Sequence, residues 1–185
     1  RLVQDDLCLM RNCIDGWRLV AASLCFPSSW SLQEKFDRPM DAIHEAVPGF
    51  SGQMATRIAR IFDHLKPGAP VWRLNWSIYD DGALHHPETK SVRRWAGEDG
   101  SLGEQAFVRV ERQTLAKLPI SGDILFTIRV YTDPVTAFAM HPRGRDLAKG
   151  LRSQLLALDQ AQLKYKNLLA DRDRLAESLA RFASD

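Results

Sequence analysis

Among the side chains able to bind a metal ion, two of the five histidines, His44 and His64, stand out by their surroundings. His44 lies next to Ile43 and shortly before the Pro48-Gly49 break, so we expect its backbone to be held by a turn. Three interpretations stay open for His44: a buried core residue, a metal ligand or a solvated helix end. His64 is expected at the edge of the apolar face of a helix. These two histidines are therefore the serious candidates for a metal ligand.

The other histidines have plainer explanations. His85 and His86 are adjacent beside a predicted turn, and we expect both to be solvated loop residues. His141 precedes Pro142 at a predicted helix entry, where capping or exposure is expected. Cys25 can in principle supply a thiolate ligand, but no Cys-Pro pair accompanies it, and it ranks third behind the histidines.

Arg112 occupies the apolar face of a predicted strand from Phe107 to Leu115, where it shares that face with two valines. A guanidinium on such a face needs a partner. It can form a buried ion pair, reach water from an edge, or act as a fixed cation for a carboxylate, a propionate or bound dioxygen. On the opposite face we expect Arg109, Glu111 and Gln113 to be solvated.

The preceding predicted strand, Val71 to Tyr79, presents a similar choice. Arg73 and Asn75 lie on one face of it, and Trp72 and Trp76 lie on the other. Which of the faces meets a ligand stays undecided. Tryptophans at this spacing are more often core residues than an aromatic cage for a small alkylammonium ion.

The composition limits the classes of function. The formal net charge of +2 comes from 25 basic and 23 acidic residues mixed along the chain, which argues against a nucleic-acid-binding stripe. No apolar run reaches the roughly 20 residues that span a bilayer, and no signal peptide is recognisable, so we expect no membrane partner.

Cysteine usage and the missing motifs limit the chemistry that this chain can perform by itself. The three cysteines lack a C-x-x-C spacing, and free thiols in a reducing cytoplasm are the simplest interpretation. Serine-nucleophile, phosphate-loop, zinc-protease and dinucleotide-binding motifs are absent. We therefore expect a cytoplasmic protein that takes the electrons for any redox chemistry from another chain.

The candidate residues need a scaffold, and the hydrophobic pattern predicts one. Two apolar runs around Asp15-Gly16 predict a β-hairpin. Apolar residues repeating every three or four positions from Phe50 to Leu65 predict a helix capped by Ser51. Three alternating segments then predict strands, with a long loop from Leu84 to Gln105. This order predicts an α+β fold, a PAS-like half-open antiparallel sheet whose helical side holds a ligand.

Leucines beyond Pro142 predict a helical tail. They recur at helical spacing, and the pattern predicts two helices with a break between Asp159 and Lys166. We therefore expect a ligand-binding PAS-like domain over residues 1–140 and a C-terminal helical extension over residues 141–185, packed on or beside it.

Several short runs, taken in order, resemble one known family. They are Leu2-Val-Gln-Asp-Asp-Leu-Cys-Leu9, Cys25-Phe-Pro-Ser-Ser-Trp30, Glu34-Lys35, Ile43-His-Glu-Ala-Val-Pro48, Arg73-Leu-Asn-Trp76, Val110-Glu-Arg-Gln-Thr-Leu115 with Leu118-Pro119, and Phe126-Thr-Ile-Arg129. The ordered set is similar to the α-subunit family of haem-dependent oxidative N-demethylases, from Arg1 to about Lys166. The resemblance implies a haem-binding PAS domain that acts as an enzyme.

The resemblance also implies cofactors and partners. This chain would bind haem b, while NADPH, FMN and a 2Fe-2S centre would be carried only by reductase or ferredoxin-type partner subunits. A small secondary alkylamine, such as dimethylamine, would be oxidised with dioxygen to a primary amine and formaldehyde. The alternative is a PAS module that binds or senses haem or a small molecule without turnover.

Within that resemblance the candidate residues take roles. His44 lies inside a matched run, so it is the expected axial ligand of the haem iron, with His64 in reserve. Arg73, Asn75 and Arg112 are expected to help bind the haem, and Arg112 is also the expected catalytic residue. A core histidine that donates to a carbonyl remains the alternative for His44.

Overall fold

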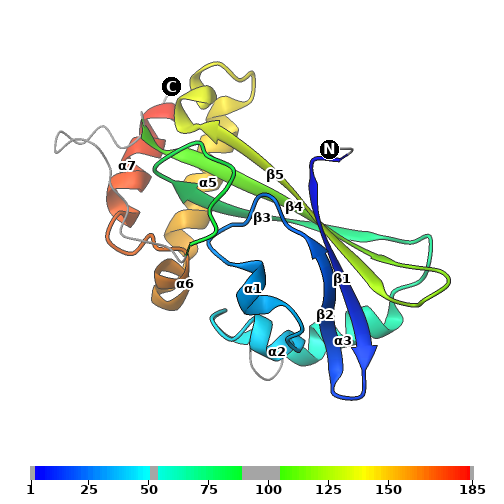
Figure 1. Ribbon diagram of the computed structural model, residues 1–185. Coiled ribbons are helices and arrows are strands. Elements are labelled where there is room, and N and C mark those ends of the chain that lie inside the picture. Colours follow the sequence, from blue (N-terminus) through cyan, green and yellow to red (C-terminus); the bar gives the residue numbers. More distant parts are fainter. Residues whose placement is uncertain (1–2, 51–53, 89–104, 184–185) are drawn as a thin grey trace. The chain divides into compact units, whose positions relative to one another are not determined.

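Five strands form one sheet with the order β2-β1-β5-β4-β3 (Figure 1). The structure is a computed structural model that describes residues 3–50, 54–88 and 105–183. The strands are β1 (Asp5–Cys13), β2 (Gly16–Ser23), β3 (Val71–Tyr79), β4 (Phe107–Lys117) and β5 (Ile124–Pro134). The predicted hairpin and the three later strands are therefore confirmed, as are the α+β class and the PAS-like antiparallel sheet.

The helices of the described residues fall into two groups along the chain. The first group lies between β2 and β3 and comprises α1 (Leu32–Lys35), α2 (Met40–Ile43) and α3 (Ala55–His64). The second follows β5 and comprises the 3-10 helix η2 (Val135–Ala139), α5 (Gly144–Ala157), α6 (Gln160–Tyr165) and α7 (Arg172–Ala183). Ser51, the predicted cap of the long helix, and most of the predicted 84–105 loop lie outside the described residues.

The chain forms two compact units, and strands β3, β4 and β5 each contribute to both. The first, called here the hairpin unit, consists of Arg1–Asn75, Leu84–Thr89 and Val110–Tyr131. The second, called here the tail unit, consists of Trp76–Ala83, Lys90–Arg109 and Thr132–Asp185. The division into domains at residue 140 stays a prediction.

Antiparallel pairing joins β1 to its neighbours on both sides. Leu7 lies opposite Ser23 of β2 and opposite Thr127 of β5, and the register with β2 shifts between Leu9 and Met10. A shift of this kind is a β-bulge, which increases the local twist of the strand. The pairing gives β1 one face that carries Asp6, Cys8 and Met10 and another that carries Asp5 and Leu7.

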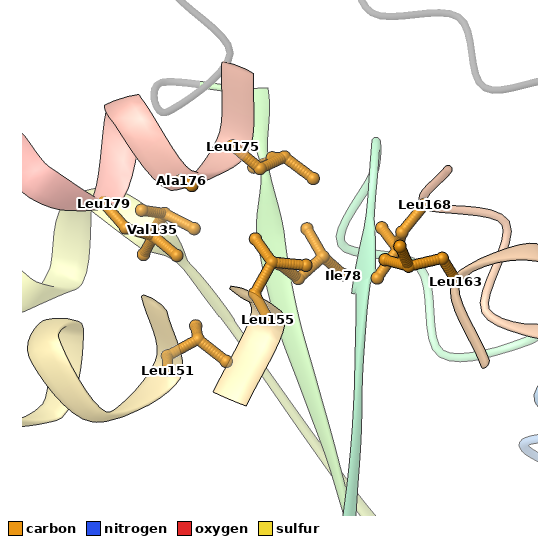
Figure 2. Close-up of a cluster of buried hydrophobic side chains, with 10 residues drawn as sticks. Ile78, Val135, Leu151, Leu155, Leu163, Leu168, Leu175, Ala176 and Leu179 are labelled. Atoms are coloured by element: carbon orange, nitrogen blue, oxygen red, sulfur yellow. The ribbon is translucent and has the colours of Figure 1, made fainter. Parts of the chain in front are cut away.

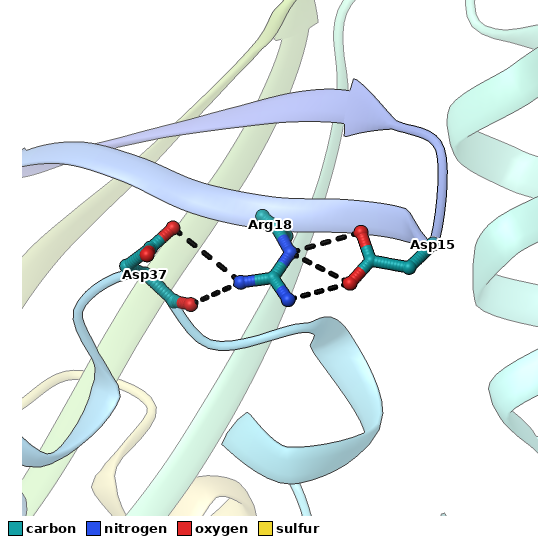
Figure 3. A network of polar contacts seen from close by, with 3 residues as sticks. All are labelled: Asp15, Arg18 and Asp37. Atoms are coloured by element: carbon teal, nitrogen blue, oxygen red, sulfur yellow. Dashed lines mark hydrogen bonds and ion pairs between the residues drawn. The ribbon is translucent and has the colours of Figure 1, made fainter.

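A polar network anchors the tight turn of the β1–β2 hairpin (Figure 3). Gly16 has a φ of +101°, a conformation that favours glycine, and it follows Asp15 at the turn. Arg18 Nε lies 2.9 Å from each carboxylate oxygen of Asp15, and Arg18 Nη1 donates to Asp37 in the segment after α1. The hydrogen bonds from Arg18 lower the pKa of Asp15. The network thus ties the hairpin to the first helical group.

The core of the hairpin unit lies between the hairpin and the first helical group. Its buried members are Cys8, Met10, Trp17, Leu19, Met40, Phe50, Phe62, Leu65 and Ile124, and Leu115 and Phe126 pack against them. Every second residue of a strand points to the same face, so Leu115 identifies the face of β4 that this core covers. That face carries the odd-numbered residues of β4.

The tail unit has its own core, made by leucines of the three tail helices and by residues of β3 and the 3-10 helix (Figure 2). Ile78, Val135, Leu155, Leu168 and Leu175 are among its buried members. The prediction of two tail helices was wrong in number, because the expected break contains α6.

Local capping explains why a helix forms inside the expected break. The Asp159 side chain accepts from the backbone N–H of Gln162 at 2.8 Å, and the Gln162 side chain accepts from the backbone N–H of Asp159 at 3.0 Å. This reciprocal capping box satisfies two donors that a helix start leaves unpaired. Leucine spacing alone does not reveal it.

Over the described residues, no helix combines the length and the hydropathy that a membrane crossing requires.

Candidate functional site

A cluster of four polar side chains, called here the polar cluster, lies on β3 and β4 in the hairpin unit. Arg73 Nε donates to Gln113 Oε1 at 2.8 Å, and Gln113 Nε2 donates to Glu111 Oε2 at 2.8 Å. Asn75 Nδ2 donates to the same Glu111 oxygen at 3.3 Å. The contacts match Arg73 with Gln113 and Asn75 with Glu111, so the residue numbers run in opposite directions, as antiparallel strands require.

Gln113 connects a cation to an anion in this cluster. Its carbonyl oxygen accepts from Arg73, so its amide nitrogen is the atom that faces Glu111. The hydrogen-bond network therefore decides the orientation of the amide. A guanidinium that polarises an amide strengthens the bond that this amide donates onward. Arg73 and Glu111 are thus coupled through one amide and not through a direct ion pair.

Glu111 is buried, which sequence reasoning missed. Its exposed fraction is 8%, and that of Arg109 is 2%, so the prediction that this face of β4 is solvated was wrong for both. For Glu111 the reason is that Leu115, which lies on the same face of β4 in the same unit, packs into the core of the hairpin unit. A strand with charges among apolar residues on both faces does not indicate which face the rest of the chain covers.

Arg109 belongs to the tail unit and has its own environment. Its Nη1 donates to the carbonyl oxygen of Ala83 at 3.3 Å, and its guanidinium carbon lies 5.6 Å from the centre of the Tyr79 ring. A cation over an aromatic face at this distance is stabilised by the ring quadrupole. These contacts account for the burial of a charged side chain there.

His44 immediately follows α2, and its ring has a defined orientation. Nδ1 lies 2.9 Å from the carbonyl oxygen of Met40. A carbonyl oxygen only accepts, so Nδ1 carries the proton and Nε2 keeps its lone pair. The imidazole also stacks on the Phe50 ring, with centroids 4.3 Å apart and planes 9° from parallel. The ring is therefore held on one edge by a hydrogen bond and on one face by an aromatic neighbour.

The surroundings of His44 favour its neutral form. Burial lowers the pKa of the imidazole most, and the positive charges of Lys35 and Arg73 lower it further. The bond to Met40 and the charge of Asp41 act in the opposite direction but do not reverse the shift. A neutral imidazole with a free Nε2 lone pair is the form that binds a metal ion. The effect of Arg73 also relates His44 to the polar cluster.

The reserve ligand, His64, has similar local geometry in a different environment. It ends α3, its Nδ1 lies 2.8 Å from the carbonyl oxygen of Arg60, and its side chain is exposed. His85 Nδ1 lies 3.1 Å from the carbonyl oxygen of Cys25, and it too is exposed. In the part of the chain that the structure describes, no three His, Cys, Asp or Glu side chains gather closely enough to hold a metal ion.

The structure also bears on the predictions for His86, His141 and the cysteines. His86 is half-buried and forms an isolated β-bridge with Ser28, so it is not the fully solvated loop residue that was predicted. His141 Nδ1 accepts from the backbone N–H of Arg143 at 3.0 Å, which is the predicted capping role. All three cysteines are free thiols. Burial, together with the charge of Asp6, raises the pKa of Cys8 to about 12, so this residue stays protonated at neutral pH.

Arg112 lies on the face of β4 opposite to the polar cluster. Its side chain is 48% exposed, and Nη2 is 4.0 Å from Asp5 Oδ1. Asp5 also lies 3.8 Å from Arg129 Nη1, so two guanidinium groups share one carboxylate. The structure thus gives Arg112 an ion-pair partner. It brings Arg73 and Asn75 together and separates Arg112 from them.

The tryptophans of β3 differ from one another. Trp72 is exposed, whereas Trp76 packs against the core of the tail unit. Lys166 Nζ lies 5.0 Å from the centre of the Trp76 ring, so that ring already has a cation over it. The expectation that these residues serve the core is confirmed for Trp76.

Comparison with protein families identifies the chain. A family model described as "Haem-dependent oxidative N-demethylase, alpha subunit-like" matches residues 1–176. The chain belongs to this family. The match confirms the family that the ordered runs indicated, and it ends within α7 (Arg172–Ala183).

The donor set of the hairpin unit fits the haem in the family description. Haem iron binds an imidazole nitrogen, and a ligating histidine generally donates its other ring N–H to a carbonyl or carboxylate. His44 meets both conditions through Nε2 and the Met40 carbonyl. Haem also carries propionate carboxylates, which guanidinium groups bind well, and Arg73 is an exposed guanidinium whose charge acts on His44.

Proposed function

We propose that this chain is the haem-binding subunit of an oxidative N-demethylase that oxidises a small secondary alkylamine, such as dimethylamine. The products are a primary amine and formaldehyde, and dioxygen is the oxidant. Membership of the α-subunit-like family supports this proposal. We further propose a cytoplasmic enzyme whose partners are proteins and small molecules, and the near-balanced charge of +2 accords with such partners.

His44 is the observation that carries the proposal. Its Nδ1–H is bound to the Met40 carbonyl, its ring stacks on Phe50, and its lowered pKa favours the neutral form. Each of these features prepares Nε2 to act as the axial ligand of haem b. A ring that is already oriented loses less conformational freedom on binding than a freely rotating one.

Arg73 and Asn75 would contribute to binding through the polar cluster. Arg73 is the exposed cation of that cluster and would pair with a propionate of the haem. Asn75 donates to Glu111 and keeps that carboxylate oriented on the same face of the sheet. These residues bind and orient, and none of them supplies electrons.

The haem, when bound, would supply the oxidative chemistry on the amine and dioxygen. For each amine oxidised, one carbon–nitrogen bond is broken, one molecule of dioxygen is reduced, and two electrons are required from outside. The family description names an alpha subunit, which implies that the enzyme has other subunits. We assign electron supply to reductase or ferredoxin-type partner subunits that carry NADPH, FMN and a 2Fe-2S centre.

The test is haem binding by two matched histidine variants. His44 and His64 both donate Nδ1–H to the carbonyl four residues earlier, at 2.9 and 2.8 Å, so each substitution removes the same local bond. We expect His44→Ala to lose the Soret band of the reconstituted protein and His64→Ala to retain it. The opposite result would transfer the ligand role to His64. Haem binding without amine-dependent oxygen consumption would instead support a sensing module.

The catalytic role of Arg112 stays a prediction, and Arg73 provides its comparison. Both are arginines of adjacent strands in the hairpin unit, on opposite faces of the sheet. Oxygen consumption per bound haem should fall in Arg112→Ala if Arg112 acts on the reacting atoms. If the Asp5 ion pair is its whole role, turnover will match that of the unmodified chain, while Arg73→Ala will still weaken haem binding.

A further inference from the structure

Glu111 is a buried carboxylate whose hydrogen bonds are concentrated on one oxygen. Oε2 accepts from the amides of Gln113 at 2.8 Å and Asn75 at 3.3 Å. Among the residues that the structure describes, Oε1 accepts no hydrogen bond, and no cation forms an ion pair with Glu111. Among the same residues, Arg172 Nε is the one side-chain nitrogen or oxygen that is fully buried and has no hydrogen-bond partner. Glu111 Oε1 also has no partner but is not such an atom, so part of its surface remains accessible.

Such an arrangement is unfavourable for folding. A carboxylate taken out of water is normally balanced by a cation or by several charge-assisted hydrogen bonds. Here the exposed fraction is 8% and both donors are neutral amides. An uncompensated charge in a covered position is expected where the protein binds a ligand of the opposite charge.

We propose that Glu111 binds the ammonium group of a small alkylammonium ion, with Oε1 accepting one of its N–H groups. Aliphatic amines resemble the lysine side chain, whose pKa is about 10.4, so they are cations at neutral pH. A primary or secondary ammonium offers both the missing positive charge and the missing donor. This inference rests on the proposed function, which identifies the alkylammonium ion as the substrate of the enzyme.

The polar cluster explains how Glu111 keeps its charge available. Arg73 is the nearest cation in the network, but it reaches Glu111 only through the amide of Gln113. Gln113 and Asn75 hold Oε2, and Arg73 remains exposed with its own charge. One face of β3 and β4 therefore presents a negative group and a positive group side by side. The negative group suits an ammonium ion, and the positive group suits a carboxylate.

The experiment measures binding of dimethylammonium to the haem-loaded chain by NMR titration or calorimetry. Glu111→Gln keeps an oxygen that can accept from both amides but removes the charge. We expect dimethylammonium to bind it about 10- to 100-fold more weakly, the range for losing a hydrogen bond to a charged group. Glu34→Gln is the matched control, because Glu34 is an exposed glutamate of α1 in the same unit. The affinity of this variant for dimethylammonium should be unchanged.

Two further probes separate charge from shape. Tetramethylammonium carries the charge but has no N–H, and isopropanol has a similar size but no charge, so both should bind more weakly than dimethylammonium. Glu111→Asp should recover part of the affinity that Glu111→Gln loses. Equal affinity for dimethylammonium in the unmodified chain and in Glu111→Gln would overturn the inference, as would an equal loss in Glu34→Gln.

Stability measurements separate ligand binding from a structural role. If Glu111 serves the ligand, Glu111→Gln will unfold at the same urea concentration as the unmodified chain or at a higher one, because a buried charge has been removed. A structural carboxylate would instead make the variant less stable. An intact Soret band with unchanged dimethylammonium affinity would remove only the Glu111 inference. If the unmodified chain shows no Soret band after reconstitution with haem, the proposed function is removed. Binding of dimethylammonium to the haem-free chain would still test the role of Glu111.

Discussion

Replacing Phe50 with leucine should weaken haem binding through His44, although Phe50 itself is no ligand. The Phe50 ring is 3% exposed and stacks on His44 at 4.3 Å with a 9° angle between the planes. Leucine preserves an apolar side chain in the core but cannot stack. An aromatic pair contributes about 0.5–1.5 kcal/mol beyond its burial. Losing that contribution to the orientation of His44 corresponds to about a 2- to 10-fold weaker affinity for haem.

Phe62 is a matched control in the same core. It is 4% exposed and contacts the Trp17 ring edge-on, with centroids 5.2 Å apart and an angle of 79°. Phe62→Leu therefore removes a buried aromatic pair of similar size without touching His44. Both variants should lose roughly 1–2 kcal/mol of stability, as is usual when a core side chain changes shape and volume. Only Phe50→Leu should also change the affinity for haem.

The assay combines urea unfolding with a haem titration followed at the Soret band. NMR titration of the His44 ring in the haem-free chain gives a further reading. Burial is the largest cause of the lowered pKa of His44, so this pKa should rise toward its ordinary value when Phe50→Leu admits water to the ring. Equal loss of haem affinity in Phe50→Leu and Phe62→Leu would refute the reasoning, because the effect would then follow general destabilisation.

Two further predictions concern stability. Arg11 donates to both carboxylate oxygens of the buried Asp123, at 3.0 and 2.9 Å, and these bonds lower the pKa of Asp123. A carboxyl whose pKa is lower in the folded state stabilises the fold above its ordinary pKa of about 3.9, and this contribution is lost as the pH falls through the folded value. Urea unfolding across this range should thus show a steeper loss of stability at low pH in the unmodified chain than in Arg11→Ala; equal slopes would contradict this. In α5, a Cβ on Gly144 would lie 1.7 Å from the carbonyl oxygen of Phe138, whereas a Cβ on Gly150 would meet nothing within 4 Å. Gly144→Ala should therefore lower the melting temperature, and Gly150→Ala should raise stability by up to about 1 kcal/mol; the reverse order would show that the segment before α5 can move aside.

Sequence periodicity predicted the strands well because alternation is a local property. The expected strand from Val71 to Tyr79 is β3 with the same bounds, and the Asp15-Gly16 turn lies where the hairpin was expected. The number of tail helices was wrong because the capping box of Asp159 starts a helix within a segment that lacks leucine spacing. Local pattern therefore decided which elements form, and local side-chain chemistry decided where some of them begin.

Periodicity could not decide which face of β4 is covered. Alternation places Glu111 with Gln113 and places Arg112 on the other face, and this much was correct. Coverage depends on Leu115 meeting residues of the hairpin and of the helices that precede β3, which are distant in sequence. With charges on both faces of the strand, the sequence favoured Arg112 as the covered cation. In the structure Arg112 is half exposed and Glu111 is buried.

The same limit applies to the histidines. His44 and His64 each donate Nδ1–H to the carbonyl four residues earlier, so their local bonds do not distinguish a ligand from a helix end. What distinguishes them is the environment beyond the local bond: His44 is stacked on Phe50 and lies within the field of Arg73, and His64 is exposed.

The polar cluster likewise exists only after folding, because its strand-to-strand bonds join residues 36 and 40 positions apart. Sequence motifs can name Arg73 and Glu111 separately, but only the pairing of β3 with β4 makes them one electrostatic unit. A substitution at Gln113 should therefore affect both ends of that unit at once. Alternation places Gln113 beside Glu111 on one face of β4, but Arg73 lies 40 positions from Gln113, so the sequence does not suggest the coupling in advance.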